Sequence, residues 1–141
     1  MKNKLLSITI IMLLAITLVA VVAGIIILKL SKGDEPKEPK IEEVVASSVD
    51  IPEITTNLVG GKFIKISFKI QTDSEKAKTE LEQRDFQVKD IIIKEISETN
   101  AETLKGKDGI VNLENNIKEK INELMQEGTI IRVYTTSFIL Q

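Results

Sequence analysis

The sequence of 141 residues contains no cysteine and no histidine, and these two absences exclude several large classes of chemistry. Without cysteine there is no disulfide, thiolate nucleophile or zinc-thiolate site, and without histidine there is no imidazole base or imidazole metal ligand. Most hydrolase and metalloenzyme mechanisms are therefore excluded. The lack of cysteine is compatible with a location outside the cell but does not require one.

Charge is unevenly distributed along the chain. Residues 1–32 carry four lysines and no acidic residue, whereas residues 33–141 carry 15 basic and 21 acidic residues, so the two parts have net charges of +4 and −6. An acidic domain repels the phosphate backbone, and we therefore expect no nucleic-acid partner. The length allows one modest domain and an appendage.

The longest uncharged segment covers residues 5–28. At about 1.5 Å per residue, a helix of this length spans roughly 36 Å, enough to cross a bilayer core of about 30 Å. A cleaved signal peptide is the alternative, because residues 21–23 before Gly24 form an acceptable cleavage site. The apolar segment continues past that site to Leu28, which favours an uncleaved transmembrane helix.

Lysines flank this segment on both sides, so the distribution of positive charge gives almost no preference for an orientation. The first flank is only four residues long, whereas the second leads into a polar domain. We therefore predict that residues 1–4 form a short cytoplasmic tail and that the remainder lies outside the cytoplasmic membrane.

Residues 29–50 have the composition of an extended tether, because Pro36 and Pro39 stand among charged, mainly acidic residues. Near its end, Val44 and Val45 are suited to begin an edge strand. We expect residues 51–141 to form a single extracytoplasmic α+β domain.

Two strands are predicted at the start of this domain. Between residues 62 and 71, apolar and polar residues alternate, which is typical of a strand with one solvated face. Residues 53–58 form the expected partner strand, and Gly60 and Gly61 suit the hairpin turn between them.

Helical spacing follows. Thr72 and Glu75 have the spacing of a capping box and predict a helix start, as do Thr99 and Glu102 further along the chain. The expected core-facing residues of the first two helices are Ala77, Leu81, Phe86, Ile92, Ile93 and Ile96. Residues 106–109 are expected to reverse the chain after a short helical turn.

The last helix has the clearest pattern, and Gly128 is expected to end it. Its predicted core face comprises Leu113, Ile117, Ile121, Leu124 and Met125. Residues 129–140 are rich in β-branched and aromatic side chains, which predicts a long strand buried on both sides in its middle. The order of two strands, three helical pieces and one strand predicts an antiparallel sheet with helices on one face.

No residues form a convincing catalytic constellation. Glu80 with Asp85 and Glu119 with Glu123 could act as carboxylate pairs, but their basic neighbours favour a solvated face with ion pairs such as Glu114 with Lys118. The glycine pairs lack the residues of a phosphate loop, and Asp73, Ser74 and Glu75 lack the spacing of a calcium loop. We therefore predict no catalytic residue, cofactor, metal site or small-molecule substrate.

The basic row Lys62, Lys65 and Lys69, with Phe63 among them, predicts a solvated strand face. One aromatic residue is too few for a nucleic-acid binding sheet.

Several sequence features together resemble the FliL family of flagellar basal body-associated proteins. They are Asn57 and Leu58 before the glycine turn, the segment LEQRDFQVKDIIIKEIS at residues 81–97, and the closing pattern of Gly109, Leu113, Ile117, Asn122, Gly128, Val133, Tyr134, Phe138 and Gln141. Thr135 and Ser137 depart from the pattern, which often has Phe and Asp there.

The resemblance implies a non-enzymatic, single-pass protein of the cytoplasmic membrane and the flagellar basal body. It further implies a domain similar to the ring-forming domain of stomatin-type (SPFH) proteins, a homo-oligomer, and association with the stator subunits of the flagellar motor. Two alternative functions remain: a general stomatin-like membrane scaffold unrelated to motility, and an envelope-anchored ligand-binding module.

Overall fold

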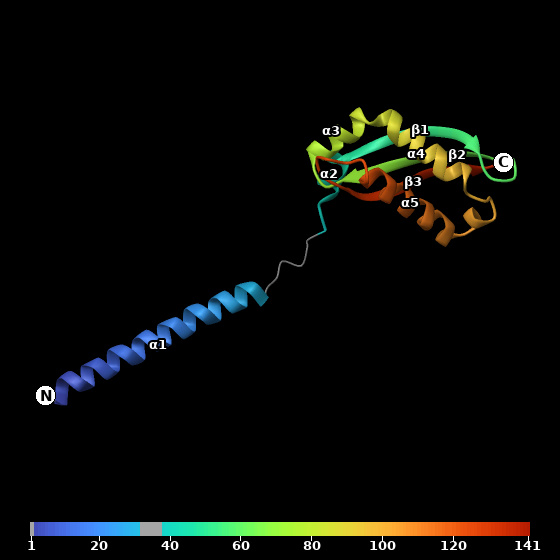
Figure 1. Ribbon diagram of the computed structural model, residues 1–141. Helices are drawn as coiled ribbons and strands as arrows, with labels where there is room; N and C mark the ends of the chain where they lie inside the picture. Colours follow the sequence, from blue (N-terminus) through green and yellow to red (C-terminus); the bar gives the residue numbers. More distant parts are fainter. Residues whose placement is uncertain (1, 32–37) are drawn as a thin grey trace. The chain divides into compact units, whose positions relative to one another are not determined.

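The computed structural model describes residues 2–31 and 38–141, and the chain forms two compact units, Met1–Pro39 and Lys40–Gln141 (Figure 1). In the first unit, α1 (Lys2–Ser31) is one helix that is long and apolar enough to cross a membrane. It contains the whole of the predicted segment 5–28. The central part of the expected tether, residues 32–37, lies outside the described residues.

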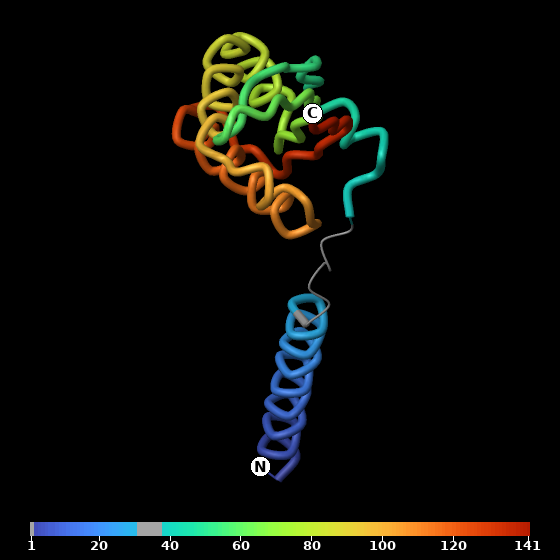
Figure 2. Tube along the Cα trace, turned by 90° about the vertical axis from the view of Figure 1, so that its right-hand side faces the viewer, coloured from blue at the N-terminus to red at the C-terminus, as the bar shows by residue number. Residues whose placement is uncertain are grey.

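The second unit has two layers, with a three-stranded antiparallel sheet in the order β1-β2-β3 and helices on one face (Figures 1 and 2). This confirms the predicted α+β class. Its elements are α2 (Ile41–Ala46), β1 (Ser48–Asn57), β2 (Phe63–Thr72), α3 (Glu75–Gln83), α4 (Asp85–Ser97), the 3-10 helix η1 (Thr103–Lys105), α5 (Lys107–Asn122) and β3 (Ile130–Leu140).

The central strand β2 supplies the middle of the core, as its alternation predicted. Ile64, Ile66, Phe68 and Ile70 are all buried. The glycine turn before β2 is also confirmed, since Gly60 and Gly61 have φ of +93° and +85°. The partner strand β1 begins earlier than expected, because Ser48 pairs with Gln71. Pro52 is tolerated within β1 because an edge strand leaves one side of its backbone unpaired.

Val44 and Val45 do not begin a strand, contrary to the prediction. They lie in α2, where the Val44 amide donates to the Lys40 carbonyl at 3.1 Å and closes a helical turn. The Ser48 hydroxyl also donates to the Val44 carbonyl, so this turn is fixed against the start of β1.

Neither predicted capping box forms. Ser74, not Thr72, caps α3, because its Oγ accepts from the Ala77 amide at 3.2 Å. Thr72 ends β2, and its hydroxyl donates to the Ser47 carbonyl at 2.7 Å. The side chain that the spacing predicted to cap the helix thus bonds to another segment of the chain. In the second predicted box, of Thr99 with Glu102, the Glu102 amide donates to the side chain of Asn100 and not to the side chain of Thr99.

The buried face of α4 differs from the predicted stripe. Val88, Ile92 and Ile96 are buried, whereas Phe86 and Ile93 are 72% and 41% exposed. The buried positions continue the face that begins at Leu81, at intervals of seven, four and four residues. Phe86 and Ile93 lie off that face.

Leu113, Ile117 and Ile121 are buried on α5, as predicted. The helix already contains Gly109 in its first turns, so residues 106–109 are not a simple reversal, and it ends at Asn122 instead of at Gly128. The Asn122 side chain accepts from the Ile130 amide at 2.7 Å and donates to the Ile130 carbonyl at 3.3 Å. These two bonds fix the start of β3, and Leu124, beyond the helix end, is only half-buried.

The prediction that the last strand is buried on both sides is wrong. β3 is an edge strand whose inner face alone is covered by helices, chiefly α5 (Figure 2). Ile130 and Val133 are buried, whereas Ile131 and Ile139 are each 46% exposed. A three-stranded sheet with one covered face leaves such apolar residues accessible.

Candidate interaction surfaces

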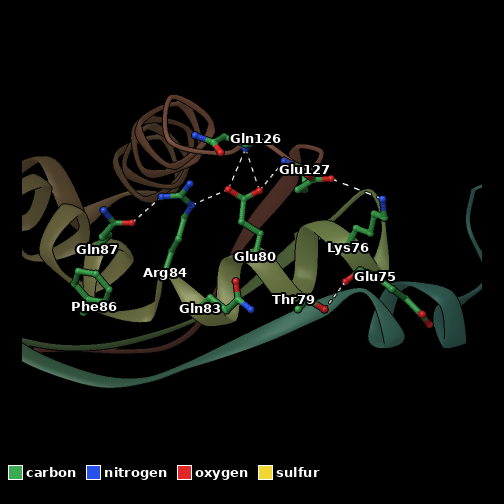
Figure 3. Close-up of a pocket in the computed structure, with 10 residues that line it drawn as sticks. All are labelled: Glu75, Lys76, Thr79, Glu80, Gln83, Arg84, Phe86, Gln87, Gln126 and Glu127. Carbon is green, nitrogen blue, oxygen red and sulfur yellow. Dashed lines mark hydrogen bonds and ion pairs between the residues drawn. The ribbon is translucent and has the colours of Figure 1, made fainter.

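A shallow polar groove of about 830 Å³ lies on the helical layer, between α3, the start of α4 and the loop before β3 (Figure 3). It is lined by Glu75, Lys76, Thr79, Glu80, Gln83, Arg84, Phe86, Gln87, Gln126 and Glu127. The groove is open to solvent, so it lacks the enclosed apolar interior of a typical small-molecule site.

Glu80 organises this groove by binding the loop before β3. Its carboxylate accepts from the backbone amides of Gln126, at 3.0 and 3.1 Å, and of Glu127, at 2.7 Å. It also accepts from Arg84 Nε at 2.7 Å (Figure 3). Burial opposes ionisation of Glu80, but these hydrogen bonds and the Arg84 charge outweigh it and lower the pKa of Glu80.

In one of the carboxylate pairs considered from sequence, Glu80 with Asp85, each carboxylate has a cationic partner. Glu80 is held by Arg84, and Asp85 forms an ion pair with Lys89 at 2.8 Å. The expected pair of Glu114 with Lys118 is also absent from the described residues, because Glu114 binds Thr135 instead. For Glu114, sequence spacing suggested an i to i+4 partner, whereas packing provided a partner 21 residues away.

An apolar groove of about 510 Å³ lies between α4 and α5 and shares Phe86 and Gln87 with the polar groove. Ile91 and Leu124 line it, and Lys120 is among the charged residues around it. Phe86 is 72% exposed where the two grooves meet. Exposed aromatic residues beside apolar grooves are common features of protein interfaces. The sequence pattern predicted Phe86 on the core-facing side of the helix, so its exposure on this surface is a finding of the structure.

The uncovered face of the sheet is the second candidate surface. Residues on this face include Phe63, Lys65, Lys69, Arg132 and Tyr134. Lys69 forms an ion pair with Asp50 at 3.0 Å, and the Arg132 guanidinium lies 4.9 Å from the centre of the Tyr134 ring. Lys65 makes no ion pair within residues 2–31 and 38–141.

The residues considered for calcium have a structural role. Ser74 Oγ and Thr129 Oγ1 donate to the Asp73 carboxylate at 2.9 and 3.2 Å, and Ser74 itself caps α3. Partial desolvation opposes ionisation of Asp73, but hydrogen bonds from Ser74 and Thr129 outweigh it and lower the pKa of Asp73. Across the described part of the chain, no group of three or more acidic residues is arranged to hold a metal ion.

Comparisons with known proteins agree with the sequence resemblance. The family model "Flagellar basal body-associated protein FliL" matches residues 48–141, which extend from the first residue of β1 to Gln141. The Flagellar protein FliL of Bacillus subtilis (strain 168) is 49% identical over 111 residues, which cover 79% of each chain. The chain therefore belongs to the FliL family of flagellar basal body-associated proteins.

Proposed function

We propose that this protein is a single-pass membrane component of the flagellar basal body that self-associates and supports or positions the stator units of the motor. The FliL family match over residues 48–141 carries the proposal. The apolar helix α1 supplies an anchor, and the folded unit offers two exposed surfaces. The family is one of flagellar accessory proteins and is not a known enzyme family, which supports a role through binding instead of catalysis.

We further propose that the amino terminus is cytoplasmic and that the folded unit lies outside. The topology can be tested with single cysteines, because the chain has none of its own. Glu42 is exposed on α2, whereas Ser48 is buried and unsuited to labelling. Glu42→Cys in intact cells should react with an impermeant thiol reagent. Reaction only after lysis would reverse the orientation.

Anchoring explains how modest surfaces can assemble. Eight residues separate Ser31 from Lys40, and a chain of that length reaches at most roughly 30 Å. Confinement to this height above the bilayer can raise the local concentration of weak interfaces toward about a millimolar. We expect the isolated unit to be a monomer or a weak oligomer and the anchored protein to assemble, in the stomatin-like ring that the family resemblance implies.

The uncovered sheet face is the surface that we assign to the stator. Lys65 is the better probe, because Lys69 is already paired with Asp50. Lys65→Glu should reduce motility with the fold intact, and Lys118→Glu on α5 is the matched charge reversal on the helical layer. Equal motility of the two variants would contradict this assignment.

The decisive experiment is a tagged purification from membranes, followed by detection of stator subunits. Copurification of stator subunits with the unmodified protein, and their reduced recovery with Lys65→Glu, is the expected result. A second experiment is site-specific crosslinking in membranes from several exposed cysteine positions. If the folded protein forms no crosslink to itself or to a stator subunit, the scaffold function is contradicted. A ligand-binding module would then be the better explanation, although both grooves are open.

A further inference from the structure

The three-stranded sheet has two edges, and each exposes backbone groups that could pair with another strand. The edge formed by β1 is interrupted. Pro52 lacks an amide hydrogen, and the register with β2 shifts between Ile51 and Ile54. These two features make β1 a poor template for an added strand.

The edge formed by β3 has the opposite composition. Its 11 residues, IIRVYTTSFIL, include no proline or glycine and only one charged residue, Arg132. Most of them are β-branched or aromatic, as in strands that pair readily. Ile131 and Ile139, near its two ends, are each 46% exposed. This strand would be a strong template for pairing if its edge were open.

One side chain occupies the middle of that edge. Glu114 of α5 accepts the Thr135 amide at 2.9 Å and the Thr135 hydroxyl at 2.8 Å, both through Oε1. Thr135 is the midpoint of β3, and the pairing with β2 shifts register beside it. The Glu114 carboxylate therefore accepts the hydrogen bond of a strand amide. It occupies the position that a backbone carbonyl of an added strand would need.

We propose that Glu114 keeps the outer edge of β3 closed, and that the strand it excludes is β3 of a second copy of this chain. Antiparallel pairing of two β3 strands about their midpoints would bring Ile131 of each copy close to Ile139 of the other. Both exposed isoleucines would then be covered, which makes the edge self-complementary. The same pairing would bring two Glu114 carboxylates toward the two-fold axis, where their like charges repel.

This inference goes beyond the proposed function, because it concerns an assembly that the protein avoids. With β1 interrupted and β3 closed, association of the anchored protein is left to its faces. Exposed sheet edges invite unwanted pairing and aggregation, and natural proteins suppress both with charged side chains and proline at edges. Thr135 takes part because its hydroxyl supplies the second bond to Glu114.

The test uses the full-length chain in membranes with a single cysteine at Thr136→Cys, an exposed position beside the midpoint of β3. Oxidative crosslinking is measured in the Thr136→Cys protein, and in the same protein carrying in addition either Glu114→Ala or Glu119→Ala. Glu119 is the matched control, since it is an exposed acidic residue of α5 without a side-chain bond among the described residues. Removing a charged hydrogen-bond acceptor should raise the crosslinked fraction by about tenfold with Glu114→Ala.

No increase with Glu114→Ala in a folded protein, or an equal increase with Glu119→Ala, would overturn the proposal. Glu114→Gln retains an oxygen acceptor without the charge and should remain uncrosslinked if the hydrogen bonds close the edge. If Glu114→Ala does not fold, hydrogen exchange of the unmodified chain decides the matter. The Thr135 amide should then exchange at least about tenfold more slowly than an unprotected amide, and unprotected exchange would contradict the closed edge.

Discussion

Replacing Gly128 by alanine tests the contact between the loop before β3 and the start of α3. Gly128 has φ of +124°, a conformation that L-residues rarely adopt, and this strain alone costs about 1 to 3 kcal/mol. An added Cβ would also overlap Asp73 Oδ1 and lie 2.9 Å from Ala77 Cβ. Ala77 is buried and cannot withdraw, so the loop itself must shift.

The shift also affects Asp73. Its carboxylate accepts from Ser74 Oγ at 2.9 Å and from Thr129 Oγ1 at 3.2 Å. Moving it would lose part of these hydrogen bonds, each worth about 1 kcal/mol net and less here because Asp73 is exposed. Together the effects give a loss of roughly 2 to 4 kcal/mol for Gly128→Ala. In a domain of this size the melting temperature should fall by at least about 10 °C.

The assay is thermal and urea unfolding of residues 40–141, the unit that contains the whole sheet and its helices. Gly106→Ala is the matched control, because Gly106 has φ of −130° and no neighbouring atom within 4 Å of an added Cβ. The double variant with Asp73→Ala separates the two causes: Gly128→Ala should cost less in that background, while the backbone strain remains. Equal unfolding free energies for Gly128→Ala and Gly106→Ala would refute the reasoning.

Three further outcomes follow from the same structure. Ile117→Ala should cost about 2 to 5 kcal/mol by leaving a cavity in the core, whereas Leu124→Ala should cost distinctly less because Leu124, past the end of α5, is half-buried. Equal urea midpoints for the two variants would contradict this assignment of the core residues. Ser74→Ala should cost about 1 kcal/mol by removing the cap of α3, and an unchanged urea midpoint would rule out that capping role. The Glu80 pKa is lower in the folded state, so ionised Glu80 stabilises the fold above the ordinary Glu pKa of about 4.3, and this contribution is lost as the pH falls through the folded value. Unfolding midpoints of Glu80→Gln should therefore change less than those of the unmodified unit when the pH is lowered from 7 to 3, and parallel pH profiles would contradict the bonding of Glu80 to the loop.

Local sequence patterns were sufficient to predict an element and its buried residues where a single hydrophobic period and a single covered face apply along the whole element. Ile64, Ile66, Phe68 and Ile70 alternate, and each is buried, because β2 is the central strand with one covered face. The glycine turn before β2 and the spacing of Leu113, Ile117 and Ile121 were equally informative. The uncharged segment at residues 5–28 likewise predicted α1, since length and hydropathy alone define such a helix.

Capping and element boundaries were not determined locally. Thr72 has the spacing of a capping residue, but β2 extends to it and the Ser47 carbonyl accepts its hydroxyl. Asn122 ends α5 because its side chain binds the backbone of Ile130. In both cases the decisive partner comes from another element, and no sequence window contains it.

The candidate surfaces divide in the same way. The sequence by itself determined the charged composition, the absence of cysteine and histidine chemistry, and the apolar segment, because these depend only on residue identity. Only the tertiary structure decided that Glu80 binds the loop before β3, that Phe86 is exposed, and that Glu114 binds the edge strand. These three features depend on which elements pack together, and residues 46, 47 or 21 positions apart become partners only after the helices have been placed on the sheet.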